Sequence, residues 1–132
     1  MSYEPVHTIW DYYDGPREGI ADFQGKPHLY KCQFSEVDDD WTDLYWLMEI
    51  DQDTFELAKE QYEIFLRWRA EFQLGKVPLE THPVLPPERA RYEELRNIIG
   101  DRLKLEPVCS VTRRARFNRD PPAFSLVEWV EP

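Results

Sequence analysis

The chain is poor in cysteine and glycine. Its 132 residues include two cysteines and five glycines. Two cysteines are too few for the disulfide framework of a small secreted domain, and Cys32 and Cys109 do not form a C-x-x-C pair. We therefore expect both to be reduced, buried thiols that pack as small apolar side chains.

The chain also has no long apolar run. The longest, Leu44 to Met48, is far shorter than the roughly 20 residues that a membrane-spanning helix needs. The first ten residues have neither a basic start nor an apolar stretch, so they do not resemble a signal peptide. The sequence therefore predicts a soluble, cytoplasmic protein that does not contact a membrane.

Motifs of the common catalytic and metal sites are missing. There is no G-x-S-x-G, P-loop or G-x-G-x-x-G, and His7, His28 and His82 have no metal-ligand spacing. An EF-hand count from Asp38 places Asp43 where that loop needs glycine. We therefore expect no metal and no cofactor, and we assign no catalytic residue. Whether the protein is an enzyme stays open, with a non-enzymatic role favoured.

Positive charge is scarce in the first half of the chain. Residues 1–75 hold 6 Lys and Arg against 17 Asp and Glu, whereas residues 76–132 hold 10 against 9, for a net charge of −10 over the whole chain. The negative electrostatic field of this charge repels phosphate backbones and attracts basic surfaces. The charge pattern makes nucleic acid an unlikely partner class and favours a basic protein.

Apolar and aromatic residues are plentiful, at 42% and 14% of the chain, so a core can form. Alternation, turn residues and helical spacing predict strands at 6–13, 19–24, 28–35, 43–50, 108–117 and 124–130, and helices at 53–74 and from 87 onward. The expected fold is a single α+β domain, 1–132, in the order ββββααββ. Its mainly antiparallel sheet has about six strands, with one long and one shorter helix packed on one face.

The long helix has a predicted start and a predicted buried face. Asp53 and Glu56 fit a capping box, with Asp53 as the N-cap residue. Apolar residues then recur every three or four positions, which places them on one side of the helix. We expect this stripe to dock on the sheet; its members are Phe55, Ala58, Tyr62, Phe65 and Phe72, and Leu57, Ile64 and Trp68 widen it.

One polar segment could form a ligand site. Asp11, Asp14 and Arg17 lie on or near one turn, and a following hairpin centred on Gly25 could bring His28 close. Carboxylates beside a histidine and an arginine can transfer protons or bind an anion. The alternative is that Asp14 and its neighbours only shape the turn.

The same segment carries a resemblance. With the residues up to His28 it resembles a family of uncharacterised bacterial proteins that share a D-G-P-R…G-I-A…G-x-P-H pattern, over about the first fifty residues. That family has no assigned activity, so the resemblance implies no catalytic residues.

Two further clusters are candidates. A predicted acidic loop with an adjoining aromatic could contact a basic partner through Asp38, Asp39, Asp40, Trp41 and Asp43. In the strand at 108–117, Arg114 and Arg116 share one face and could bind an anion, or could only pair with acids across the sheet.

Two functions remain open from the sequence. The first is a small acidic interaction module, such as an inhibitor or adaptor, for a basic protein. The alternative is a small-molecule-binding protein or minor enzyme that uses Asp11, Asp14, Arg17 and His28. Strand order and oligomeric state are not predicted.

Overall fold

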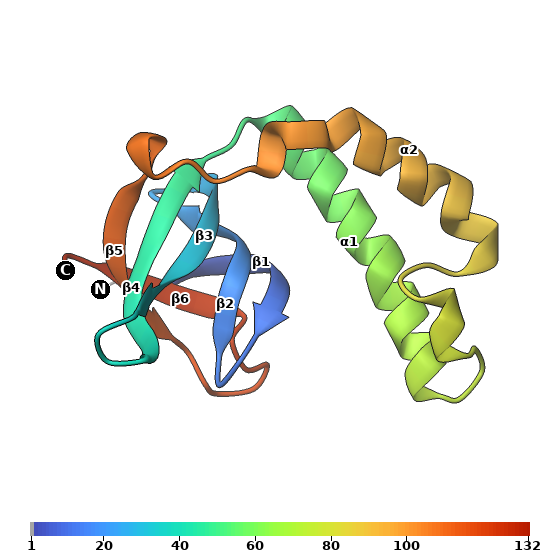
Figure 1. Cartoon of the computed structure of the whole chain (residues 1–132), viewed down its shortest axis with the longest axis horizontal. Helices are drawn as coiled ribbons and strands as arrows, with labels where there is room; N and C mark the ends of the chain where they lie inside the picture. Colours follow the sequence, from blue (N-terminus) through green and yellow to red (C-terminus); the bar gives the residue numbers. More distant parts are fainter. Residues whose placement is uncertain (1) are drawn as a thin grey trace. The chain divides into compact units, whose positions relative to one another are not determined.

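Six antiparallel strands close into a barrel in the computed structural model, which describes residues 2–132 (Figure 1). Each strand pairs with the next one along the chain, and the last pairs with the first. The strands are β1 (Glu4–Tyr12), β2 (Pro16–Phe23), β3 (Lys26–Ser35), β4 (Asp40–Glu49), β5 (Val111–Phe117) and β6 (Leu126–Val130). The expected α+β class and antiparallel six-stranded sheet are confirmed.

The expected sheet, with both helices packed on one face, did not include closure into a barrel. β1 and β6 join at Glu4 opposite Val127 and Pro5 opposite Leu126, which closes the sheet. Register shifts along β1, between Val6 and Thr8 and again near Asp11, mark bulges of the kind that bend a strand. Closure needs such bending and a stagger between strands, and neither is visible in an alternating sequence pattern.

The inner face of the barrel is filled by aromatic side chains of the strands. Tyr30 is fully buried, and its ring centroid lies 6.1–6.2 Å from those of Tyr45, Phe117 and Trp129. At such separations tilted and edge-to-face rings attract one another beyond the gain from burial alone. Tyr30 and Cys32, two positions apart on β3, therefore both face the barrel interior.

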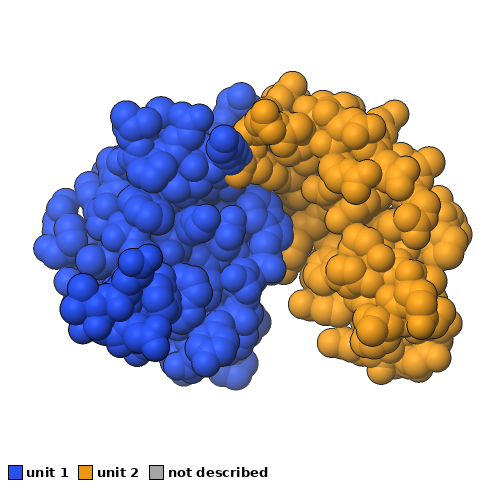
Figure 2. All heavy atoms as spheres, in the orientation of Figure 1, with its two compact units in different colours: residues 1–51, 104–132 blue, residues 52–103 orange. Residues whose placement is uncertain are grey.

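The chain divides into two compact units, residues 1–51 with 104–132 and residues 52–103 (Figure 2). The first unit is the barrel. The second contains α1 (Gln52–Gln73), α2 (Arg89–Ile99) and the short 3-10 helices η1 (Leu79–Thr81), η2 (Pro86–Glu88) and η3 (Gly100–Leu103). Another 3-10 helix, η4 (Pro107–Cys109), precedes β5. These four short helices interrupt the expected ββββααββ order.

The two helices bury side chains against each other. Ile64 of α1 packs with Leu95 of α2 and with Val84 of the connecting segment. In α1 the buried residues are Thr54, Ala58, Ile64 and Trp68. Of the stripe expected from the sequence, Ala58 is buried and Phe72 is exposed. Ile64 and Trp68, which were expected only to widen the stripe, are buried, because the helical period alone does not show which part of an apolar face meets a partner.

The start of α1 also differs from the prediction. The helix begins at Gln52, so Asp53 lies within its first turn rather than at the N-cap. Its carboxylate instead accepts a hydrogen bond from Arg102, at 3.0 Å. No helix in the part of the chain that the structure describes is long and apolar enough to cross a membrane.

Candidate functional site

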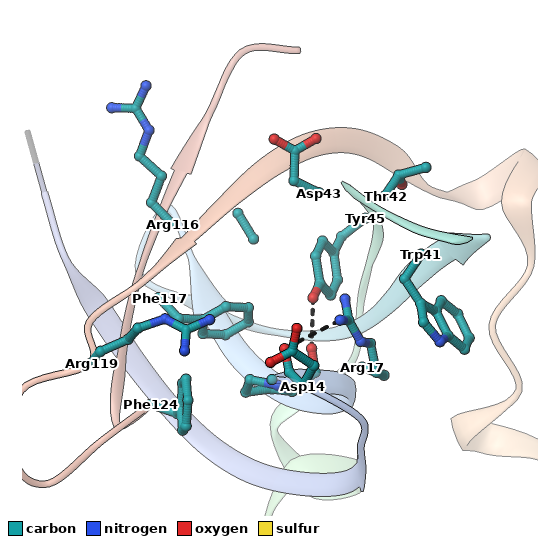
Figure 3. Close-up of a pocket in the computed structure, with 13 residues that line it drawn as sticks. Asp14, Arg17, Trp41, Thr42, Asp43, Tyr45, Arg116, Phe117, Arg119 and Phe124 are labelled. Carbon is teal, nitrogen blue, oxygen red and sulfur yellow. Dashed lines mark hydrogen bonds between the residues drawn. The ribbon is translucent and has the colours of Figure 1, made fainter. Parts of the chain in front are cut away.

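A pocket of about 440 Å³ opens at one end of the barrel (Figure 3). Because neighbouring strands are antiparallel, the end of β1, the start of β2, the start of β4 and the end of β5 meet at this rim. We call this cavity the end pocket. Its lining residues are Asp14, Gly15, Pro16, Arg17, Trp41, Thr42, Asp43, Tyr45, Ala115, Arg116, Phe117, Arg119 and Phe124.

Arg17 is held at the pocket wall by the turn that precedes it. Its guanidinium donates to the carbonyl oxygens of Tyr13, at 2.7 Å, and Asp14, at 3.2 Å, and lies 3.4 Å from the sulfur of Cys32. The same group lies 5.5 Å from the centroid of the Trp41 ring, within cation–π range. Among residues 2–132 no carboxylate lies within ion-pair distance of Arg17.

Tyr45 fixes the turn from inside the barrel. Its hydroxyl donates to the carbonyl of Pro16 at 2.6 Å. Burial raises the pKa of Tyr45 above its ordinary value, because a buried phenolate would lose its hydration, and the neighbouring Cys32 acts in the same direction. The hydroxyl is therefore a neutral donor at neutral pH and keeps Pro16 and Arg17 in place.

Arg119 is the second arginine of the pocket without an acidic partner in the described residues. Its guanidinium lies 5.3 Å from the centroid of the Phe124 ring. In the view of Figure 3 the carboxylate of Asp14 lies between the guanidinium groups of Arg17 and Arg119, whereas Arg116 points away from both. The pocket thus presents two charged fork-shaped donors, each with an aromatic ring beside it.

The other arginines of this run are paired. Arg114 donates to both oxygens of Asp43, at 2.5 and 2.6 Å, and Arg116 lies 3.7 Å from Glu128. At the candidate anion site, Arg114 and Arg116 are therefore already paired with acidic side chains. Of these two arginines, Arg116 alone lines the end pocket.

The four residues of the predicted polar site are not brought together as a set. Asp14 and Arg17 meet in the end pocket. His28, by contrast, pairs with Ala21 near the opposite end of β2 and β3, where its Nδ1 lies 2.8 Å from the Lys26 carbonyl oxygen. The hairpin turn at Gly25 carries His28 away from Arg17, because the two residues lie at different heights on the ladder.

Asp11, the remaining member, is exposed on β1 opposite Glu18. It does not line the end pocket. Asp11 lies on β1, whereas Asp14 lies in the turn between β1 and β2.

The predicted acidic cluster is divided between a turn and the pocket. Asp38 and Asp39 are exposed in the turn between β3 and β4, and Asp40 is exposed as the first residue of β4; we call these three residues the acidic turn. Their neighbours Trp41 and Asp43 line the end pocket. Two clusters that the sequence treats separately, around Arg17 and around Trp41, thus share one cavity.

A second cavity has a volume of about 570 Å³, and most of the acidic side chains that line it already have hydrogen-bond or ion-pair partners. Glu4 accepts the backbone N–H groups of Gln24 and Gly25, and Glu131 pairs with Arg113 at 3.6 Å. Glu128 also lines it; its Oε1 is buried without a hydrogen bond, although Arg116 lies 3.7 Å away. Nowhere in residues 2–132 do three acids, histidines or cysteines converge as a metal site would require.

Phe117, Arg119 and Phe124 were not predicted as site residues. Phe117 ends β5, and the other two lie in the connection between β5 and β6. The sequence Asp120-Pro121-Pro122 indicates a turn. The only sequence signal for these site residues was that Arg119 and Phe124 flank this turn.

Comparisons of the chain with protein-family models, curated proteins and solved structures found no match. Fold and site therefore define it only as a six-stranded antiparallel barrel protein with an arginine-bearing pocket at one barrel end and a separate helical unit. Function has to be inferred from that pocket.

Proposed function

We propose that this protein binds a small organic anion in the end pocket. The observation that carries the proposal is a contrast among the arginines of the barrel unit. Arg113, Arg114 and Arg116 each have a carboxylate within ion-pair distance, whereas Arg17 and Arg119, both lining the pocket, have none among the described residues. Arginine that faces a cavity without an internal acid is free to bind a carboxylate or phosphate in a bidentate manner.

The rest of the pocket suits such a ligand. Its volume of about 440 Å³ lies within the range of small-molecule sites. Trp41, Phe117 and Phe124 supply apolar walls beside the two guanidinium groups. Anchoring of Arg17 by two backbone carbonyls lowers the entropy that would be lost when a ligand orders this side chain.

The test uses 3-phenylpropanoate as a probe, a carboxylate with one aromatic ring. Amide chemical shifts should change around Asp14 to Arg17, Trp41 and Phe117 to Phe124 as the probe is added. Arg119→Gln should weaken binding about tenfold, the usual loss for one charged hydrogen-bonding partner. Arg119 is exposed, so the variant should keep its melting temperature.

The chain offers a matched control for this variant. Arg69 is also exposed, and its guanidinium lies 5.8 Å from the centroid of the Phe65 ring in the helical unit. Arg69→Gln therefore removes an equivalent charge without touching the pocket, and it should leave binding unchanged. Equal effects of the two variants, or shift changes spread over the whole surface, would contradict the proposal.

The acidic turn supports a second candidate function, as an interaction module for a basic protein. Asp38, Asp39 and Asp40 are exposed at the surface. Next to them Phe34, which is 46% exposed, packs edge-on against Trp41 at a centroid distance of 5.1 Å. Charge that steers a partner, beside an aromatic contact, is the composition expected of a protein interface. The test of this candidate is a binding measurement on variants of the turn, argued in the Discussion.

A further inference from the structure

We infer that the ligand of the end pocket is a zwitterion, an α-amino acid with an aromatic side chain, whose ammonium group is bound by Asp14. This inference rests on the proposed function, since the carboxylate of the amino acid would be the anion that Arg17 and Arg119 bind. It adds a second, oppositely charged contact and fixes the chemical class of the ligand.

The first step is the state of Asp14. This residue lines the pocket and is exposed, and no side-chain hydrogen bond or ion pair engages its carboxylate among residues 2–132. Its backbone carbonyl accepts from Arg17 at 3.2 Å, so acid and arginine are neighbours whose charged groups have not neutralised each other. Asp43, the other aspartate of the lining, is already bound by Arg114.

The second step is the charge pattern that results. The end pocket has two guanidinium groups without an acidic partner among the described residues, and in the view of Figure 3 the carboxylate of Asp14 lies between them. A plain anion would satisfy the arginines and leave Asp14 facing a like charge. A ligand with carboxylate and ammonium on one carbon satisfies both signs, because each group then has an opposite charge to meet.

The third step is the side chain of the ligand. Trp41 and Phe124 each lie beside one of the two arginines, and Phe117 lines the same cavity. The aromatic side chain of the amino acid would pack against these three rings while its charged groups stay at the rim of the pocket. Aromatic rings in contact gain from edge-to-face geometry as well as from burial, so an aromatic amino acid fits better than a small polar one.

The test compares three probes that share one ring. L-phenylalanine has both charged groups, 3-phenylpropanoate lacks the ammonium and 2-phenylethylamine lacks the carboxylate. Calorimetry on the full chain should show phenylalanine binding at least about tenfold more tightly than phenylpropanoate, the usual effect of one charge-assisted contact, and the amine binding most weakly. Amide shifts should place phenylalanine in the end pocket.

Asp14→Asn is the decisive variant, because it removes the charge and keeps the shape. Asp14 has a backbone φ of 53°, and asparagine tolerates this left-handed region well, so the turn should survive. The variant should remove the preference for phenylalanine over phenylpropanoate. Asp39→Asn is the matched control, since Asp39 is an exposed turn residue with φ of 52°, and it should leave the preference intact.

The outcomes separate the two proposals. If phenylpropanoate binds as tightly as phenylalanine and Asp14→Asn changes neither affinity, the zwitterion inference is wrong while anion binding stands. If neither probe binds in the pocket, both are wrong. If phenylalanine binds more tightly and the preference survives Asp14→Asn, Asp14 is not the ammonium site and the inference is overturned.

Discussion

The hydroxyl of Tyr30 donates a hydrogen bond to the carbonyl of Thr8 at 2.8 Å, so a side chain from β3 reaches across β2 to β1. The residue that it crosses is Gly19, which pairs with Tyr30 on one side and Ile9 on the other. A Cβ atom at Gly19 would lie 2.1 Å from the Thr8 oxygen and 2.7 Å from the Tyr30 hydroxyl. Glycine is needed here for space, not for its backbone angles.

We predict that Gly19→Ala destabilises the barrel by about 3 kcal/mol or more, because a backbone oxygen must move or the buried bond must break. Denaturant unfolding measures the loss. Gly25→Ala is the control: its φ of 75° carries a strain cost, but nothing lies within 4 Å of the added carbon. It should cost only about 1 kcal/mol. Equal losses in the two variants would show that the Thr8 oxygen and the Tyr30 hydroxyl leave room for a side chain at position 19.

The two cysteines should differ in reactivity. The sequence predicted both as buried, but only Cys32 is; Cys109 is exposed in η4, with its sulfur 3.7 Å from a Glu106 oxygen. The error came from treating Val108 and Cys109 as part of a strand, whereas β5 begins at Val111. A thiol reagent should therefore modify one cysteine in the native protein and the second only on denaturation. Two rapidly reacting thiols would place Cys32 nearer the surface.

The strand pattern, the helices and the Gly25 turn follow from local sequence, because alternation, caps and turn residues act within a few positions. The closed barrel does not, since closure depends on bulges in β1 and on the meeting of Glu4 with Val127, which are far apart in sequence.

The site was predicted in fragments for the same reason. Asp14 and Arg17 share a turn and could be found together, but Trp41 and Arg119 join them only through the barrel. His28 was assigned to the site because a hairpin at Gly25 could bring it close, but the antiparallel register places it at the other end of β2 and β3. Local patterns identify site residues within a turn and miss those that the topology adds.

Alkaline pH should destabilise the barrel through Tyr45. Burial raises its pKa above the ordinary value of 10.0. The unfolded chain therefore releases this proton at lower pH than the folded protein, so stability is complete below about pH 10 and falls as pH rises toward the folded pKa, by about 1.4 kcal/mol per pH unit for one proton.

Tyr45→Phe should remove that part of the pH dependence, although it also loses the hydrogen bond to Pro16. Unfolding curves between about pH 9 and about pH 11 measure the slope in each variant. Tyr13→Phe is the control, because Tyr13 is 67% exposed and should leave the slope unchanged. A Tyr45→Phe slope equal to that of the parent chain would mean that folding does not raise the pKa of Tyr45 above its value in the unfolded chain.

The acidic turn should affect association without affecting the fold. Replacing Asp38, Asp39 and Asp40 by asparagine keeps both local acceptors, the Asp38 oxygen that Ser35 donates to and the Asp40 oxygen bound by the Trp41 N–H. It also suits the backbone of Asp39, which has a φ of 52°. Asparagine oxygens accept such bonds and tolerate such a backbone, so unfolding stability should change by less than about 0.5 kcal/mol.

The same triple variant removes three charges from one exposed turn. Long-range attraction sets the encounter rate with a basic partner, and salt screens it over about 8 Å at physiological ionic strength. With a lysine-rich peptide as probe, the parent chain should therefore associate more slowly as salt rises. The variant should start with a lower on-rate and respond less to salt, while the off-rate changes little, because charge at the rim of an interface acts on approach more than on dissociation. An on-rate that ignores both the salt concentration and the three substitutions would remove the acidic turn as an interaction site and leave the end pocket as the functional surface.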